Sequence, residues 1–208
     1  MTIITYSNIS MTERSERTKP LLVFDVDGVI LNFSKGFAEY FNAKHPHLNL
    51  AHNPEEWDYG LTGTDLNLLK DNIKSFIDEG YHLELLHEDM PNSVNDAHNR
   101  FDVQIVTSFH NHSSRVSNLE KFSIKYNRIV FSDNTNKVDI LKQLGPKLIV
   151  EDCPMHVERI QRELPDAVVF VPDMWRYTQS VVGERVIKYQ DPKHLYELLH
   201  EHADRMDL

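Results

Sequence analysis

One short segment constrains the fold of this chain more than any other: residues 21–30, which read LLVFDVDGVI. Its apolar first half is typical of a strand buried on both faces of a sheet. Asp25 and Asp27 follow at once, and side chains two residues apart in an extended segment point to the same side. Gly28 permits a sharp turn beside them. The segment therefore predicts a buried strand that ends at a pair of carboxylates.

Two interpretations of this acidic pair stay open on the segment alone. Asp-Gly is a common turn pair, so Asp25 and Asp27 can simply cap a turn. However, the carboxyl ends of parallel strands are where open α/β sheets place their ligands. Two carboxylates there suit a divalent cation that prefers oxygen ligands, or a nucleophile with its acid–base partner. We favour the functional interpretation.

Length, charge and cysteine content narrow the class of protein. The chain of 208 residues is long enough for one sizeable core and a small appended subdomain. A formal net charge of -10 argues against duplex nucleic acid as a partner, whereas a single cationic pocket can still hold a small phosphate ester. No apolar run reaches the roughly 20 residues of a membrane-spanning helix. The lone Cys153 excludes an internal disulfide, which suits a reducing cytoplasm. Together these features lead us to expect a cytoplasmic protein without a membrane partner.

Apolar periodicity predicts a mixed segment after the first strand and then a regular α/β alternation. We expect helices over residues 32–45, 64–78 and 91–99, with a loop over 46–64. From there, apolar runs at 103–107, 129–131, 148–150, 168–171 and 186–187 alternate with predicted helices over 113–126, 137–144, 155–164 and 192–202. Such alternation predicts crossover units and a parallel sheet, hence an α/β fold.

Polar side chains recur where the predicted strands end. They are Asp25 with Asp27, Thr107 with Ser108, Ser132 with Asp133, and Glu151 with Asp152. Lys137 begins a predicted helix on the same side, where it can reach a shared anion. Each piece alone fits a turn or a helix start. Their joint occurrence in this order predicts a functional site at one edge of the sheet.

These groups resemble the four short motifs of the haloacid dehalogenase (HAD) superfamily of phosphotransferases. Asp25-Val-Asp27-Gly28 is similar to the first motif, Thr107-Ser108 to the second, Lys137 to the third and Glu151-Asp152 to the fourth. The resemblance covers residues 21–171, and an Asp two residues after the first is the phosphatase-like form. It implies a Rossmann-like core with a central parallel sheet flanked by helices, and a small helical cap inserted after the first strand.

The same resemblance implies how the chain divides. Residues 20–32 and 96–208 would form the core, and residues 33–95 the helical cap. Residues 1–19 are rich in Ser and Thr and lack the continuous apolar centre of a secretory signal, so we expect a flexible N-terminal lead.

The resemblance also implies a Mg²⁺-dependent phosphomonoesterase. Asp25 would attack phosphorus and form an aspartyl phosphate. Asp27 would protonate the leaving oxygen and then deprotonate the hydrolytic water. Asp25, the backbone carbonyl of Asp27, and Asp152 would hold Mg²⁺ through oxygen ligands.

Four further residues have implied roles around the phosphoryl group. Thr107 and Ser108 would hydrogen-bond its oxygens, and Lys137 would neutralise their charge. Glu151 stands where the family often has Asp, and its carboxylate would position Lys137.

Substrate choice is expected to lie in the cap. Within the superfamily, the segment DGVILNF that ends at Phe33 is most similar to the 5′(3′)-deoxyribonucleotidases and related bacterial and phage proteins, in which an aromatic residue here contacts the nucleobase. Trp57 and Tyr59 fall where that family's cap supplies further aromatic residues, although the same residues also fit buried anchors of a small subdomain. His110 is a further candidate for substrate contact. The expected substrate is a (deoxy)nucleoside monophosphate.

Other functions stay open at this point. They are a phosphatase for sugar phosphates, a phosphatase for nucleic-acid ends, and a non-catalytic binding or regulatory protein that keeps the fold. Twelve histidines, with His45 and His47 close together, invite a zinc site, but none has the spacing of a structural one. We expect these histidines to be exposed or locally hydrogen-bonded.

Overall fold

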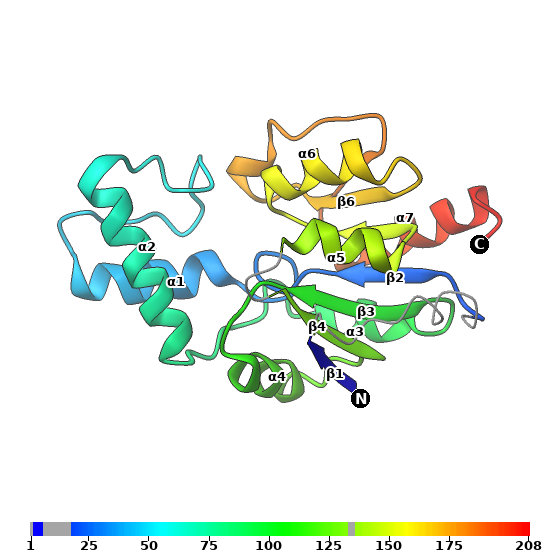
Figure 1. Cartoon of the computed structure of the whole chain (residues 1–208), viewed down its shortest axis with the longest axis horizontal. Helices are drawn as coiled ribbons and strands as arrows, with labels where there is room; N and C mark the ends of the chain where they lie inside the picture. The colour runs from blue at the N-terminus through cyan, green and yellow to red at the C-terminus, as the bar shows by residue number, and fades with distance from the viewer. Residues whose placement is uncertain (1, 6–17, 133–135) are drawn as a thin grey trace.

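The computed structural model of this chain describes residues 2–5, 18–132 and 136–208. Within these residues, seven strands form one sheet in the order β1-β4-β3-β2-β5-β6-β7, and every neighbouring pair is parallel. The strands are β1 (Thr2–Thr5), β2 (Leu21–Phe24), β3 (Asp102–Thr107), β4 (Arg128–Phe131), β5 (Leu148–Val150), β6 (Val168–Pro172) and β7 (Val186–Tyr189). The predicted α/β class and parallel sheet are confirmed (Figure 1).

Strand β2 lies at the centre of the sheet, between β3 and β5. All four of its residues are buried, as its continuous apolar sequence predicts. Phe24 pairs with Ile105 of β3 and with Val150 of β5. Because the strands are in this register, the residues that follow them come out at the same edge of the sheet.

The described residues form seven α-helices. They are α1 (Phe33–Lys44), α2 (Gly63–Asp78), α3 (Met90–Ala97), α4 (His112–Lys121), α5 (Lys137–Leu144), α6 (Pro154–Glu163) and α7 (Pro192–Arg205). Helices α5 and α6 bury Leu141 and Ile160 against one face, whereas α3 and α7 bury Val94 and Leu199 against the other. Helices α1 and α2 project beyond the ends of the strands instead (Figure 1). None of the described helices combines the length and apolar character needed to cross a bilayer.

Helix α4 ends earlier than predicted. Apolar spacing extends the helix to Tyr126, but the structure ends it at Lys121. Ser123 takes a positive φ of 55°, which breaks the helical path. The Ile124 N–H then bonds back to the Leu119 carbonyl at 3.1 Å. A left-handed residue of this kind terminates a helix without changing its hydrophobic pattern.

The N-terminal segment differs from the flexible lead predicted for residues 1–19. Thr2–Thr5 forms the edge strand β1, which pairs with Arg128–Phe131 of β4. All four of its residues are β-branched, and such residues favour strands. Residues 1 and 6–17 lie outside the described residues, as does Asp133.

The predicted cap, residues 33–95, is built mainly from α1, α2 and their connecting loop. An aromatic cluster joins the two helices: the ring centroid of Phe76 lies 5.6 Å from that of Phe37 and 5.1 Å from that of Tyr40. Helix α3 belongs elsewhere, because it packs on α7, where Ser93 Oγ donates to the Pro192 carbonyl at 2.8 Å. The division into core and cap stays a prediction, with α3 on the core side.

Candidate active site

The turn after β2 brings two aspartates to one pocket. The Asp25 N–H donates to the Val150 carbonyl of β5 at 2.9 Å, which holds this residue at the sheet edge. Gly28 takes a φ of 81°, a conformation that residues with side chains rarely adopt. Its N–H donates to the Leu31 carbonyl at 2.8 Å and closes the turn. Asp25 and Asp27 both line the pocket as a result.

Lys137 is buried between two carboxylates. Its Nζ lies 2.8 Å from Asp25 Oδ1 and 2.7 Å from Glu151 Oε2. Lys137 opens helix α5, and the start of this helix is fixed by Asn136, whose Oδ1 accepts from the Val138 N–H at 3.0 Å. Burial alone would lower the pKa of Lys137, but the two carboxylates outweigh burial and raise it. The two carboxylates therefore favour the charged form of Lys137.

The two carboxylates beside Lys137 respond differently. Burial raises the pKa of Asp25 to about 7, with Lys137 opposing it. Burial acts in the same direction on Glu151, but there Lys137 and then His156, whose Nδ1 lies 3.5 Å from Oε2, lower the pKa below its usual range. Glu151 thus stays charged as the counter-ion of Lys137, whereas Asp25 is the more readily protonated of the two.

Asp27 has a partner that the sequence analysis missed. Arg115 of α4 is fully buried, and its Nη2 donates to Asp27 Oδ1 at 2.7 Å. The Arg115 guanidinium also lies 3.7 Å from the centroid of the Phe109 ring, within cation–π range. Burial raises the pKa of Asp27, and the Arg115 charge opposes that rise. This contact fixes the direction of a carboxylate that still reaches the pocket.

Asp152, which follows β5, has two unequal oxygens. Tyr177 Oη donates to Asp152 Oδ2 at 2.6 Å. Asp152 Oδ1 is buried and has no hydrogen-bond partner within the described part of the chain. Burial, reinforced by the charges of Glu151 and Asp25, raises the pKa of Asp152 well above its usual range. A buried carboxylate oxygen without a partner is uncommon in native proteins and suits the binding of an ion or ligand.

The acidic residues fit a divalent cation. Asp25, Glu151 and Asp152 each offer one carboxylate oxygen, and these oxygens lie within 4.8 Å of one another. Across residues 2–5, 18–132 and 136–208, no other group of three His, Cys, Asp or Glu side chains meets that condition. His45 and His47, whose ring centroids lie 6.4 Å apart, belong to no such group among the described residues. An all-oxygen donor set matches Mg²⁺ better than Zn²⁺, which favours nitrogen and sulfur ligands.

Hydroxyl groups complete the polar end of the pocket. Thr107 is fully buried, and its Oγ1 has no hydrogen-bond partner among the described residues. Ser108 Oγ accepts from Ser132 Oγ at 2.8 Å. Because Thr107 and Ser108 both line the pocket, their hydroxyls are available to the oxygens of an anion bound there.

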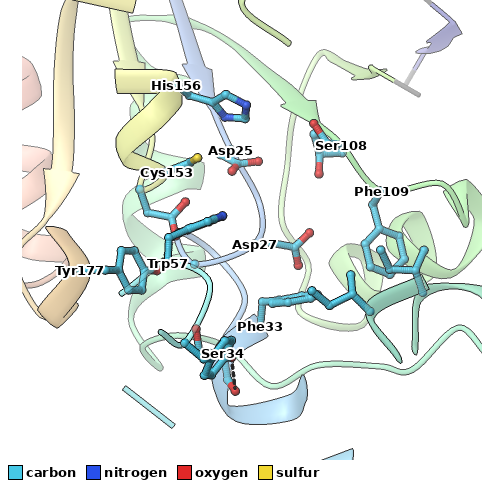
Figure 2. A pocket seen from close by; sticks show the side chains of 16 residues that line it. Asp25, Asp27, Phe33, Ser34, Trp57, Ser108, Phe109, Cys153, His156 and Tyr177 are labelled. Carbon is cyan, nitrogen blue, oxygen red and sulfur yellow. Dashed lines mark hydrogen bonds between the residues drawn. The ribbon is translucent and has the colours of Figure 1, made fainter. Parts of the chain in front are cut away.

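The pocket has a volume of about 260 Å³, and beyond its polar end the lining is apolar. Figure 2 shows Trp57 and Tyr177 on one side of Asp27 and Phe109 on the other. The aromatic and aliphatic lining residues are Phe33, Trp57, Tyr59, Ile73, Ile77, Phe109 and Tyr177. Such a lining suits a flat, largely apolar group attached to the anion.

Of the four substrate contacts predicted from the sequence, three line the pocket and His110 does not. Phe33 lines the pocket and packs edge-on against Phe76, with ring centroids 5.6 Å apart. Trp57 is 41% exposed at the pocket, and Tyr59 is half-buried, so that burial raises its pKa to about 12. His110 is exposed and is absent from the described pocket lining. Tyr59 therefore packs on the core and lines the pocket, whereas Trp57 lines the pocket as an exposed ring.

Several residues of the site were not predicted. Phe109 directly follows Thr107-Ser108, so the sequence position that suggested His110 could have suggested Phe109 instead. Arg115, His156 and Tyr177 come from segments in which no motif marks them.

Comparisons with known proteins agree with this architecture. No family profile and no curated protein sequence matches the chain, but solved structures do. A HAD family hydrolase from Deinococcus radiodurans R1, with bound phosphate and sodium, has a TM-score of 0.59 at 12% identity, over 88% of this chain and 96% of its own. A predicted phosphoglycolate phosphatase from Haemophilus somnus 129PT has a TM-score of 0.59 at 13% identity, over 88% and 99% of the two chains.

The HAD-type protein YfnB from Bacillus subtilis, bound to magnesium, is a third similar structure, with a TM-score of 0.55 at 17% identity over 88% of this chain and 99% of its own. The chain therefore has the fold of the haloacid dehalogenase superfamily, which confirms at the level of the fold the resemblance drawn from its four motifs.

Proposed function

We propose that this protein is a Mg²⁺-dependent, cytoplasmic phosphomonoesterase that acts on a (deoxy)nucleoside monophosphate. The arrangement around Asp25 carries the proposal. This carboxylate lines a pocket with Asp27, contacts Lys137, and has an oxygen within 4.8 Å of an Asp152 oxygen. A nucleophile, an acid–base group, a cation and an oxygen-rich metal position are the parts that phosphoryl transfer to a carboxylate requires. The single Cys153 suits a reducing compartment.

Asp25 and Asp27 would carry out the two chemical steps. A bond forms between an Asp25 oxygen and phosphorus while the ester oxygen–phosphorus bond breaks. Asp27 gives a proton to the leaving oxygen and then takes one from the water that hydrolyses the aspartyl phosphate, a role that contributes about 10²–10⁴-fold. The oxygen of that water bonds to phosphorus while the Asp25 oxygen–phosphorus bond breaks, so inorganic phosphate leaves and the Asp25 carboxylate is restored. Arg115 keeps the Asp27 carboxylate in place during both steps.

The phosphoryl group would be held by three side chains. Lys137 neutralises part of its negative charge, and the hydroxyls of Thr107 and Ser108 hydrogen-bond its oxygens. The unpartnered Thr107 Oγ1 supports this assignment, because it needs an acceptor or donor that the described protein residues do not provide. Glu151 positions Lys137 through their 2.7 Å contact.

Asp25, the backbone carbonyl of Asp27, and Asp152 would hold Mg²⁺. The unpartnered Asp152 Oδ1 and the all-oxygen donor set support this assignment. When bound, the ion offsets the charge of the phosphate and orients it. Glu151 belongs to the same acidic group, but both of its oxygens are already engaged: Oε2 contacts Lys137 and Oε1 accepts from the Cys153 N–H at 3.0 Å, which supports a positioning role rather than metal binding.

The apolar lining supports a nucleotide over a sugar phosphate. The Haemophilus somnus protein is named as a phosphoglycolate phosphatase, which keeps small polar esters as the alternative class. A polyhydroxylated sugar would set its hydroxyls against Phe33, Ile73 and Phe109, where they would lose their hydrogen bonds to water. A nucleobase instead offers a flat apolar face to such residues.

Phosphate release from a panel of esters tests the proposal. We expect 5′- and 3′-nucleoside monophosphates to be hydrolysed in preference to sugar phosphates and a small aryl phosphate, with activity lost when EDTA removes Mg²⁺. Asp25→Asn should abolish turnover because the amide is not a nucleophile. Asp65→Asn, which changes an exposed aspartate of α2, is the matched control and should keep full activity.

Each other outcome points to a different function. Preference for sugar phosphates would replace the nucleotidase assignment but keep the phosphatase. Turnover that persists in Asp25→Asn would remove Asp25 as nucleophile. Tight Mg²⁺ binding without turnover of any ester would favour a non-catalytic protein.

A further inference from the structure

One short segment after β6 reaches both the turn after β2 and the end of β5. Trp175 Nε1 donates to the Gly28 carbonyl at 2.7 Å, and Tyr177 Oη donates to Asp152 Oδ2 at 2.6 Å. The two rings are buried and stack on each other, with centroids 5.7 Å apart and an interplanar angle of 12°. The segment therefore fixes a carboxylate and a backbone turn of the site together.

The Asp152 carboxylate has little freedom beside this segment. A Cβ atom built on Gly28 would lie 1.9 Å from Asp152 Oδ2, so this oxygen packs directly on the glycine backbone. The Tyr177 hydroxyl donates to the same oxygen. Oδ2 is thus held by the protein, and Oδ1 is the oxygen that the described protein residues leave without a partner.

The same segment is bound to the loop of the predicted cap. Asn53 Nδ2 donates to the Met174 carbonyl at 2.9 Å, and Asn53 Oδ1 accepts from the Arg176 N–H at 2.9 Å. The Trp57 ring meets the Tyr177 ring edge-on, with centroids 5.1 Å apart (Figure 2). Residues 53–57 are therefore linked to Asp152 through Met174 and Arg176, which precede Tyr177, and through the Tyr177 ring itself.

We propose that Tyr177 is a positioning residue that orients Asp152 toward the cation, and that residues 53–57 of the predicted cap hold Tyr177 in place. The inference rests on the proposed function, which assigns Asp152 to Mg²⁺. A phenol hydroxyl donates one hydrogen bond, so it holds one carboxylate oxygen and leaves the other for the ion. Carboxylates that ligate metals are commonly oriented by hydrogen bonds of this kind.

Mg²⁺ binding in the absence of substrate tests the inference. Isothermal titration of the full chain with MgCl₂ would compare wild type, Tyr177→Phe and Tyr126→Phe. Tyr126 is the matched control, because its buried hydroxyl has no described partner and it precedes β4, at the opposite end of the strands. We expect Tyr177→Phe to raise the Kd for Mg²⁺ by about 10–100-fold, the usual effect of removing such a partner, and Tyr126→Phe to leave it unchanged.

The outcomes separate this inference from the proposed function. Equal Mg²⁺ affinity of wild type and Tyr177→Phe would overturn the positioning role and leave the phosphatase proposal intact. A wild-type protein that binds no Mg²⁺ would overturn both the metal assignment and the inference.

A second variant covers the case in which Tyr177→Phe does not fold. Asn53→Ala removes two hydrogen bonds from an exposed residue and keeps the tyrosine. Weaker Mg²⁺ binding than in wild type is expected. An unchanged Kd would overturn the link to the cap loop.

Discussion

At the scale of residues, four ionisable side chains decide what the sheet edge can hold. Lys137 contacts Asp25 and Glu151, and Asp152 lies close to both carboxylates, so the four side chains carry a net charge of −2 when all are ionised. Burial raises the pKa of Asp25 and of Asp152, because a buried carboxylate without enough positive charge is more stable as a neutral acid. A divalent cation would take the place of those protons.

Lys137→Met tests this charge balance. The variant leaves Asp25 and Glu151 buried without their cation, and we expect the free energy of unfolding to fall by about 3–5 kcal/mol, as for other broken buried ion pairs. Urea denaturation without Mg²⁺ measures it. Lys142→Met removes an exposed lysine of the same helix and should cost less than about 1 kcal/mol. Equal losses for the two variants would contradict the balance.

At the scale of elements, the hydrophobic pattern was enough to predict the bounds of a helix or strand whose burial follows from its own sequence. Strand β5 and helix α5 have the bounds that their apolar runs predicted, 148–150 and 137–144. Because the strands are parallel, their polar ends could also be predicted to meet at one edge. The end of α4 could not be, since it depends on the backbone of Ser123 rather than on apolar spacing.

The roles of Arg115 and Tyr177 could not be predicted from the sequence for a different reason. Arg115 stands in the largely polar sequence HSSRVSNLEK, which is typical of an exposed helix, and its partner Asp27 is 88 residues away in the chain. Tyr177 lies in a short 3₁₀ turn, 25 residues after Asp152. Periodicity reports local structure. These contacts are set by tertiary packing.

Trp57→Ala tests whether the loop of the predicted cap contributes to substrate choice. Loss of the ring removes an aromatic face from the pocket, so we expect KM for nucleoside monophosphates to rise far more than KM for a small aryl phosphate. Steady-state kinetics on both substrates measures the difference. Tyr81→Ala is the control, because Tyr81 is an exposed aromatic residue absent from the described pocket lining. Equal effects of Trp57→Ala on both substrates would remove Trp57 from base binding.

At the scale of the whole molecule, the net charge and the size of the pocket both favour a small substrate over a long polyanion. The chain has a formal net charge of -10, and the pocket measures about 260 Å³. A small ester needs only the local cation Lys137, which contacts Asp25 of the pocket lining. A long polyanion would meet the field of the entire surface, which is repulsive at low salt.

A phosphorylated duplex end should therefore be a poor substrate. We expect kcat/KM for a short 5′-phosphorylated DNA duplex to be at least about 10-fold below that for the matching mononucleotide, because a repulsive field slows encounter with a highly charged ligand. Phosphate release from both substrates at low ionic strength measures the ratio. Added salt should narrow the gap, since screening weakens interactions between exposed charges over about 10 Å at 0.1 M. A duplex hydrolysed as fast as the mononucleotide would instead favour a phosphatase of nucleic-acid ends, with a binding surface that overcomes the net charge.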